Sequence, residues 1–132
     1  KILLTNQRPY RWYYPNVKGV PPVARFKHSM IYYPALAVLI VYGGRNDNMY
    51  ARQESFCLGD LRVLSLELMS WCPTATYGEG PEEPRCSHSV TLFENQMMLF
   101  GGLGNTKYAD SNMRILELSS HFLLNRKLNV LL

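Results

Sequence analysis

The sequence lacks most of the features that membrane or metal chemistry requires. Its three cysteines, Cys57, Cys72 and Cys86, are widely spaced, and no C-x-x-C pair or zinc-spaced histidine pair accompanies them. We expect free thiols, which are typical of a reducing compartment, and hence a cytoplasmic or cytoskeletal protein. The longest apolar run, Ala35–Tyr42, is too short to cross a bilayer, and no basic-then-apolar leader opens the chain. We therefore expect no membrane segment and no signal peptide.

Motifs of catalysis and of nucleotide binding are missing as well. No nucleophile elbow, P-loop, H-E-x-x-H or dinucleotide fingerprint is present. The run Gly101–Gly104 is rich in glycine, but it follows an apolar strand and opens no helix, so it does not predict a phosphate cradle. We expect no cofactor, no bound metal and no nucleic-acid partner.

Acidic residues are absent from the first third of the chain. Residues 1–46 hold seven basic side chains and no acid, whereas residues 47–132 hold seven basic side chains and all ten acids. Such an asymmetry can mark a face that meets an acidic partner, and the favoured alternative is a solvated surface with one arginine held structurally. The overall composition, 47% hydrophobic and 18% charged, is that of a globular protein. Aromatics at 12%, with nine tyrosines, favour strands over helices.

An internal repeat is the most informative feature that is present. The segment 19–29 returns as 80–89, each with the pattern R-x-x-H-S behind a proline-containing stretch. Each segment leads into an apolar run that ends in a double glycine, and the second copy follows the first at offsets of 58 to 60 residues. Asp60–Leu66 is echoed by Asn112–Leu118, and a tryptophan near the end of a unit, Trp12 or Trp71, precedes each R-x-x-H-S pattern. The unequal connection after the double glycine is the kind of difference that surface loops tolerate.

The repeat predicts β-strands and no convincing helix. Short runs of β-formers are separated by turn residues, and the central runs are apolar throughout, as in strands buried on both faces. The expected strands are 28–33, 37–42, 60–67 and 71–76 in the first unit, and 88–93, 97–100 and 112–118 in the second.

These residues resemble the kelch repeat, in which a Pro/Arg/His lead-in precedes an apolar strand ending in Gly-Gly, a variable loop, an acidic-apolar strand and a tryptophan. The WD40 alternative is disfavoured because the chain has no G-H or W-D dipeptide. The resemblance implies an all-β fold of about two four-stranded antiparallel blades of a kelch-type β-propeller. It also implies structural roles for the repeated residues Arg25, His28, Gly43, Gly44, Trp71, Arg85, His88, Gly101 and Gly102.

Because propellers typically need 4–8 blades, we expect an incomplete ring whose remaining blades, or neighbouring chains, cover the outer faces. The four glycines should be largely buried, and Trp12, Trp71, Ile40, Leu99 and Leu116 should line the outer faces. We expect the end of a preceding blade in 1–18, the first repeat in 19–76, the second in 77–120, and a following element or tail in 121–132.

The predicted function is that of a protein-binding scaffold and not of an enzyme. The two histidines recur at equivalent positions, which argues against catalysis, so each ring is expected to satisfy a backbone group. The alternative is a fragment of a kelch-fold enzyme, such as a copper-radical oxidase, whose active site lies on other blades. Loops with arginine and aromatic residues suit a partner interface, although a loop that merely connects strands is an equal alternative. The partner is expected to be acidic, with a cytoskeletal or ciliary assembly as one instance. The candidate partner-binding residues are Arg45, Asp47, Met49, Tyr50, Arg52, Phe56, Lys107 and Tyr108.

Overall fold

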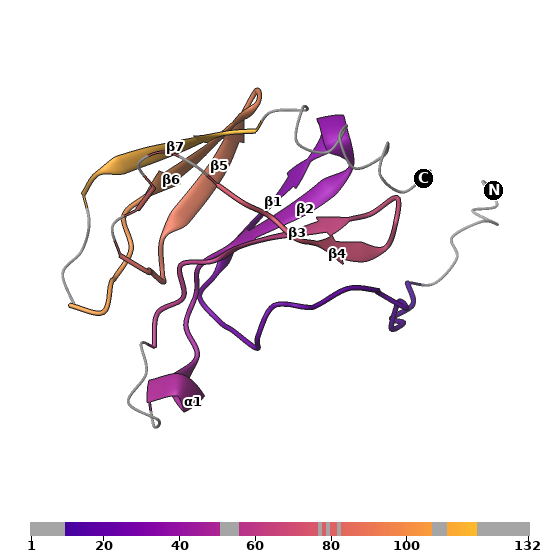
Figure 1. Cartoon of the computed structure of the whole chain (residues 1–132), viewed down its shortest axis with the longest axis horizontal. Helices are drawn as coiled ribbons and strands as arrows, with labels where there is room; N and C mark the ends of the chain where they lie inside the picture. The colour runs from indigo at the N-terminus through magenta and orange to yellow at the C-terminus, as the bar shows by residue number, and fades with distance from the viewer. Residues whose placement is uncertain are drawn as a thin grey trace, which may run out of the picture.

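The computed structural model describes residues 10–50, 56–76, 78, 80–81, 83–106 and 111–118. It contains two antiparallel sheets, with strand orders β1-β2-β3-β4 and β5-β6-β7, in which consecutive strands pair (Figure 1). The all-β expectation is confirmed. The strands are β1 Ser29–Tyr33, β2 Val38–Tyr42, β3 Leu61–Ser65, β4 Ser70–Cys72, β5 Ser89–Phe93, β6 Gln96–Phe100 and β7 Met113–Glu117.

Most strands begin and end within two residues of the predicted positions. The exception is the fourth, expected over 71–76 and observed only to Cys72, because Pro73 has no backbone N–H to donate to the sheet. Two single-turn helices were not expected. The 3-10 turn η1 (Pro34–Leu36) connects β1 to β2, and proline at its first position suits a helix start. The helix α1 (Asp47–Tyr50) follows β2.

The core lies between the two sheets, where alternate side chains of each sheet point toward the other. Figure 1 shows the sheets side by side, and β1 packs beside β5. No helix among the described residues is long and apolar enough to span a membrane. The buried members of this inter-sheet core are Tyr33, Val38, Ile40, Tyr42 and Val63 from the first sheet, and Met97 and Leu99 from the second.

The opposite face of the second sheet is open to solvent, and that of the first sheet is open over β1, while Val41 on the same face is buried. On the second sheet Phe93, Phe100 and Ile115 are each more than half exposed, and on the first sheet Met30 and Tyr32 are similarly exposed. The expected membership of these faces was partly wrong. Ile40 and Leu99 belong to the buried core, and Leu116 and Trp71 are half-buried, while Trp12 is fully exposed.

The double glycines allow the two sheets to approach each other closely. Gly43 has φ +61°, and a Cβ there would lie 2.6 Å from the Arg85 carbonyl oxygen and 2.8 Å from Cε1 of His88. Gly43 and Gly44 are buried as predicted, but Gly101 and Gly102 are only half-buried. The segment that leads into β5 covers the first glycine pair through Arg85 and His88. No described residue covers Gly101 and Gly102 in the same way.

Candidate functional site

The strongest candidate site lies on the loops that follow β2. There the backbone of Arg45 pairs with that of Phe26 through two hydrogen bonds, of 3.0 and 2.8 Å, and Arg45 also forms an antiparallel bridge with Cys57. This short ladder brings together segments before β1, after β2 and before β3. We call its surface side chains, Phe26, Arg45, Asp47 and Phe56, the loop cluster.

Arg45 is held by the rest of the loop cluster. Its guanidinium carbon lies 5.7 Å from the ring centroid of Phe26 and 4.9 Å from that of Phe56, within cation–π range of both. Its Nε donates to Oδ1 of Asp47, and this hydrogen bond raises the pKa of Arg45 further above its usual value. The result is an arginine of fixed orientation at the surface, next to a ring, Phe26, that is 43% exposed.

The structure brings together three of the eight predicted partner-binding residues, namely Arg45, Asp47 and Phe56. Met49 and Tyr50 lie in α1, but their side chains are outside the described part of the chain. Arg52, Lys107 and Tyr108 also lie outside the described residues.

Phe26 was missed by sequence reasoning. It stands inside the R-x-x-H-S lead-in, at the position that Cys86 occupies in the second copy. The sequence offered one signal: Phe26 is an aromatic residue next to Lys27, at a position where the two copies of the repeat differ. Its pairing with Arg45 depends on a backbone bridge between segments about twenty residues apart, and no local pattern reveals that bridge.

Arg25 makes an ion pair and hydrogen bonds within the first repeat. Its guanidinium binds Asp60 with two hydrogen bonds, of 2.7 and 3.0 Å, and donates to the carbonyl oxygen of Gly43 at 2.9 Å. Arg62 donates to the same carboxylate at 2.7 Å. Burial alone would raise the pKa of Asp60, but the two guanidinium groups lower it to about 2. In the second repeat Arg85 makes the matching bond to the carbonyl oxygen of Gly101, at 3.0 Å.

These ion pairs change the meaning of the charge asymmetry. Arg25 and Arg45 come from the acid-free first third, and each is paired with an acid from the rest of the chain, Asp60 and Asp47 respectively. Arg11, Lys18 and Lys27 are exposed and make no ion pair among the described residues. The free positive charge is therefore smaller than the sequence suggests.

The two repeated histidines have different environments. His88 is 8% exposed and packs edge-on against Tyr42, with ring centroids 5.4 Å apart. Burial, followed by the charge of Arg85, lowers its pKa to about 4, and a weak contact with the Tyr42 backbone opposes this. Neither ring nitrogen has a well-formed hydrogen bond among the described residues, and the backbone of Tyr42 is the polar group that the ring approaches. His28 is exposed, because no described element covers it as the first sheet covers His88.

Trp71 links β4 to the segment that enters the first repeat. It lies on β4 opposite Leu64, and its backbone N–H donates to the carbonyl oxygen of Lys18 at 2.9 Å. This bond fixes the segment that enters the first repeat along the edge of β4.

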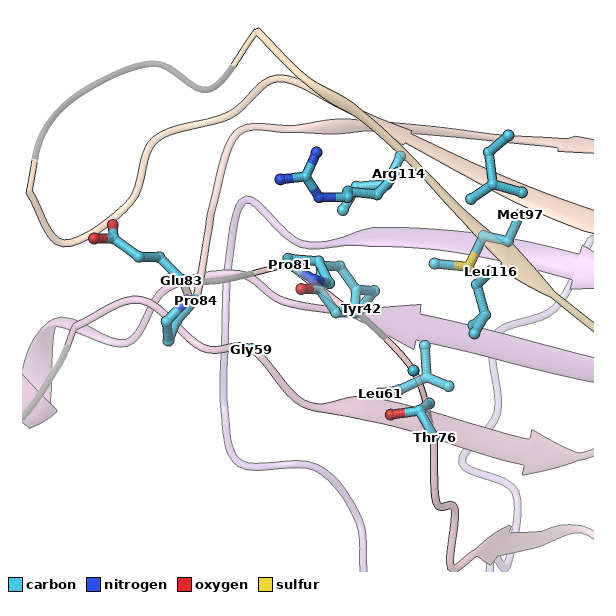
Figure 2. Close-up of a pocket in the computed structure, with 14 residues that line it drawn as sticks. Tyr42, Gly59, Leu61, Thr76, Pro81, Glu83, Pro84, Met97, Arg114 and Leu116 are labelled. Carbon is cyan, nitrogen blue, oxygen red and sulfur yellow. The ribbon is translucent and has the colours of Figure 1, made fainter.

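A cavity of about 330 Å³ lies between the sheets, at the end where Pro81 and Pro84 lie. Figure 2 shows Arg114 across the cavity from Leu61 and Thr76. Its walls are polar and apolar in about equal measure, with Leu99 and Leu116 beside Glu83 and Arg114. Among the described residues no three His, Cys, Asp or Glu side chains lie close enough together to hold a metal ion.

Comparison with known proteins gives one family match over most of the chain. Residues 1–125 match the model of the KLHDC2/KLHL20/DRC7 Kelch-repeats domain. The chain is 35% identical over 97 residues to Host cell factor of Drosophila melanogaster, which covers 70% of this chain and 6% of that protein. It is 36% identical over 95 residues to human Host cell factor 2, and the match covers 69% of this chain and 11% of that protein. It is 32% identical over 91 residues to Dynein regulatory complex subunit 7 of Chlamydomonas reinhardtii, and the match covers 69% of this chain and 7% of that protein. The chain thus spans a small part of each relative.

Proposed function

Because the chain belongs to the kelch-repeat family, we propose that its two propeller blades bind a partner protein through the loop cluster. The observation that carries this proposal is Arg45, which two phenylalanine rings and a carboxylate hold at the surface. Arginine and aromatic residues dominate the energetics of protein interfaces.

The loop cluster is suited to binding because its arginine is already ordered. A free arginine side chain loses about 0.5–1.5 kcal/mol of conformational entropy when a partner immobilises it. In this chain the contacts with Phe56 and Asp47 have already restricted that freedom. The cluster also lies on loops at the ends of the strands, away from the sheet faces through which blades pack.

The partner surface that complements this site is acidic with an apolar part. Lys27 is exposed beside Phe26, and Arg45 retains donors beyond the one that Asp47 takes. One relative is by name a subunit of a dynein regulatory complex. We therefore propose a cytoskeletal or ciliary assembly as the partner class, and a cytoplasmic or cytoskeletal location.

An enzymatic role is not proposed. Among the described residues, no three His, Cys, Asp or Glu side chains gather to hold a metal ion. The repeated histidine that is buried has its pKa lowered by burial beside an arginine, and it packs against a tyrosine ring. The kelch-fold enzyme alternative requires an active site on other blades.

Further blades are proposed to cover the two open sheet faces. Strand pairing places Phe93, Met98 and Phe100 on the outer face of the second sheet. These positions match Tyr33, Ile40 and Tyr42, which the first sheet uses to pack onto the second. The outer face of the second sheet therefore has the pattern of a blade-to-blade contact.

Photo-crosslinking in the full-length protein tests the proposed site. A photoreactive amino acid replaces Asn48, which is exposed on α1 beside the loop cluster, and in a control replaces Leu68 in the β3–β4 turn. The proposal predicts a specific protein adduct from position 48 but not from position 68. Arg45→Ala should abolish the adduct, whereas the matched control Arg11→Ala should retain it. An adduct that is equal at both positions, or that survives Arg45→Ala unchanged, contradicts the proposal.

A further inference from the structure

Two cysteines from different blades lie next to each other in the interior. The Sγ atoms of Cys57 and Cys86 are 3.7 Å apart, and the two residues are 2% and 1% exposed. Both are free thiols, as is the half-buried Cys72. The repeat does not explain the pair, because the first repeat has Phe26 where the second has Cys86.

The pair sits at the seam between the two blades. Cys57 lies before β3 in the first blade, and its Sγ lies 3.4 Å from the carbonyl oxygen of Leu103 in the second. Cys86 precedes β5 and is bridged to the same Leu103 by two backbone hydrogen bonds, of 3.0 and 2.8 Å. The backbone N–H of Cys57 also donates to the side-chain oxygen of Asn105, at 3.2 Å. Two independent contacts therefore hold Cys57 against the second blade.

We propose that Cys57 and Cys86 are a redox modification site, which forms an intramolecular disulfide that joins the two blades. A disulfide requires the sulfur atoms to approach to about 2.05 Å, so the pair needs to close by less than 2 Å. Side-chain rotation with a small backbone shift has to supply this movement, because both cysteines lie in isolated bridges outside the longer strands.

The chemistry is a thiol–disulfide exchange with a small-molecule disulfide such as oxidised glutathione. One cysteine, as its thiolate, attacks the glutathione disulfide and forms a mixed disulfide, and one glutathione thiol leaves. The second cysteine then attacks the protein sulfur of the mixed disulfide, and the second glutathione thiol leaves. Two protein thiols lose two protons and two electrons, and one glutathione disulfide becomes two thiols.

Because both cysteines are buried, we expect them to react slowly with a small-molecule disulfide. Burial, followed by the contact with Cys86, raises the pKa of Cys57 to about 12, so at neutral pH it is almost entirely a thiol. Attack therefore depends on a local opening of the seam, and a reducing cytosol keeps the pair reduced. Cys72 donates to the carbonyl oxygen of Ser70 within its own strand and has no second cysteine nearby, which makes it the matched control.

Peptide mapping of the full-length protein tests the proposal directly. Trypsin places the three cysteines on separate peptides, Gln53–Arg62, Val63–Arg85 and Cys86–Lys107. The folded protein is incubated with increasing ratios of oxidised to reduced glutathione, blocked with an alkylating agent, and digested without reductant. We expect a linked pair of the first and third peptides, two hydrogens lighter than their sum, and unchanged formation of that pair in Cys72→Ser.

Two further measurements separate the disulfide from an effect on folding. The oxidised protein should melt on the order of 5–10 °C higher than the reduced protein, and this difference should vanish in Cys57→Ala and in Cys86→Ala. The wild-type peptide map needs no variant, so it decides the question even if a variant fails to fold. The proposal is overturned if the folded, oxidised protein keeps both thiols free, carries only glutathione adducts, or links either cysteine to Cys72.

Discussion

Replacing Gly43 by alanine tests the close contact between the two blades. Gly43 has φ +61°, and the new Cβ would meet the Arg85 carbonyl oxygen at 2.6 Å and the His88 ring at 2.8 Å. A left-handed backbone costs alanine about 1–2 kcal/mol, and overpacking a tight contact costs about 1–3 kcal/mol more. We expect a loss of about 3 kcal/mol in the free energy of unfolding, or on the order of 10 °C in melting temperature.

Two other glycines separate the cost of the left-handed backbone from the cost of the tight contact. Gly78 has φ +89° but nothing within 4 Å of its Cβ position, so Gly78→Ala should lose only the backbone term. Gly80 lies outside the left-handed region and also faces open space, so Gly80→Ala should be neutral or slightly stabilising. Thermal melts followed by circular dichroism measure all three variants. If Gly43→Ala melts no lower than Gly78→Ala, the close approach of the blades is wrong.

Three further perturbations test the charge networks and the open face. Asp60→Asn should lose about 1 kcal/mol in a denaturant titration, discounted for the partial exposure of the carboxylate. Because the folded-state pKa of Asp60 is lowered to about 2, its contribution should be complete above pH 4 and fade as the pH falls toward 2, and a flat wild-type profile there would refute this. His88 has a folded-state pKa lowered to about 4, so the unfolded state binds its proton first, and stability should fall between pH 6.5 and 4. His88→Phe should flatten that part of the profile, and an unchanged slope would show that the ring is not the cause. Phe100→Lys, on the exposed outer face, should reduce the binding of a hydrophobic dye by the isolated chain and shift its melting temperature by less than about 2 °C, and a large loss of stability would place Phe100 in the core.

The repeat made the architecture predictable, because each copy carries its own strand pattern and turn residues. Pairing within each sheet is local, so the order β1 to β4 could be anticipated from the spacing alone. The sequence could not say which face of each strand lies between the blades. The strand 38–42 is apolar on both faces, and only the packed structure shows that Ile40 points to the seam.

The candidate site was predictable only in part. Arg45, Asp47 and Phe56 were selected because arginine and aromatics in a long loop suit an interface, but their mutual contacts depend on the bridge from Phe26. The different burial of His28 and His88 also lies beyond sequence reasoning, because the two residues share one motif. Their environments differ through what packs on them, which is a property of neighbouring blades and not of the repeat itself.

The central claim is that these are adjacent blades of a larger ring, so that both outer faces require a cover. Light scattering and dye binding on residues 1–132 expressed alone test it most directly. Exposed Phe93, Phe100, Met113 and Ile115 on one face, and Met30 and Tyr32 on the other, predict self-association and strong binding of a hydrophobic dye. A soluble monomer that melts cooperatively and binds no dye would contradict the claim.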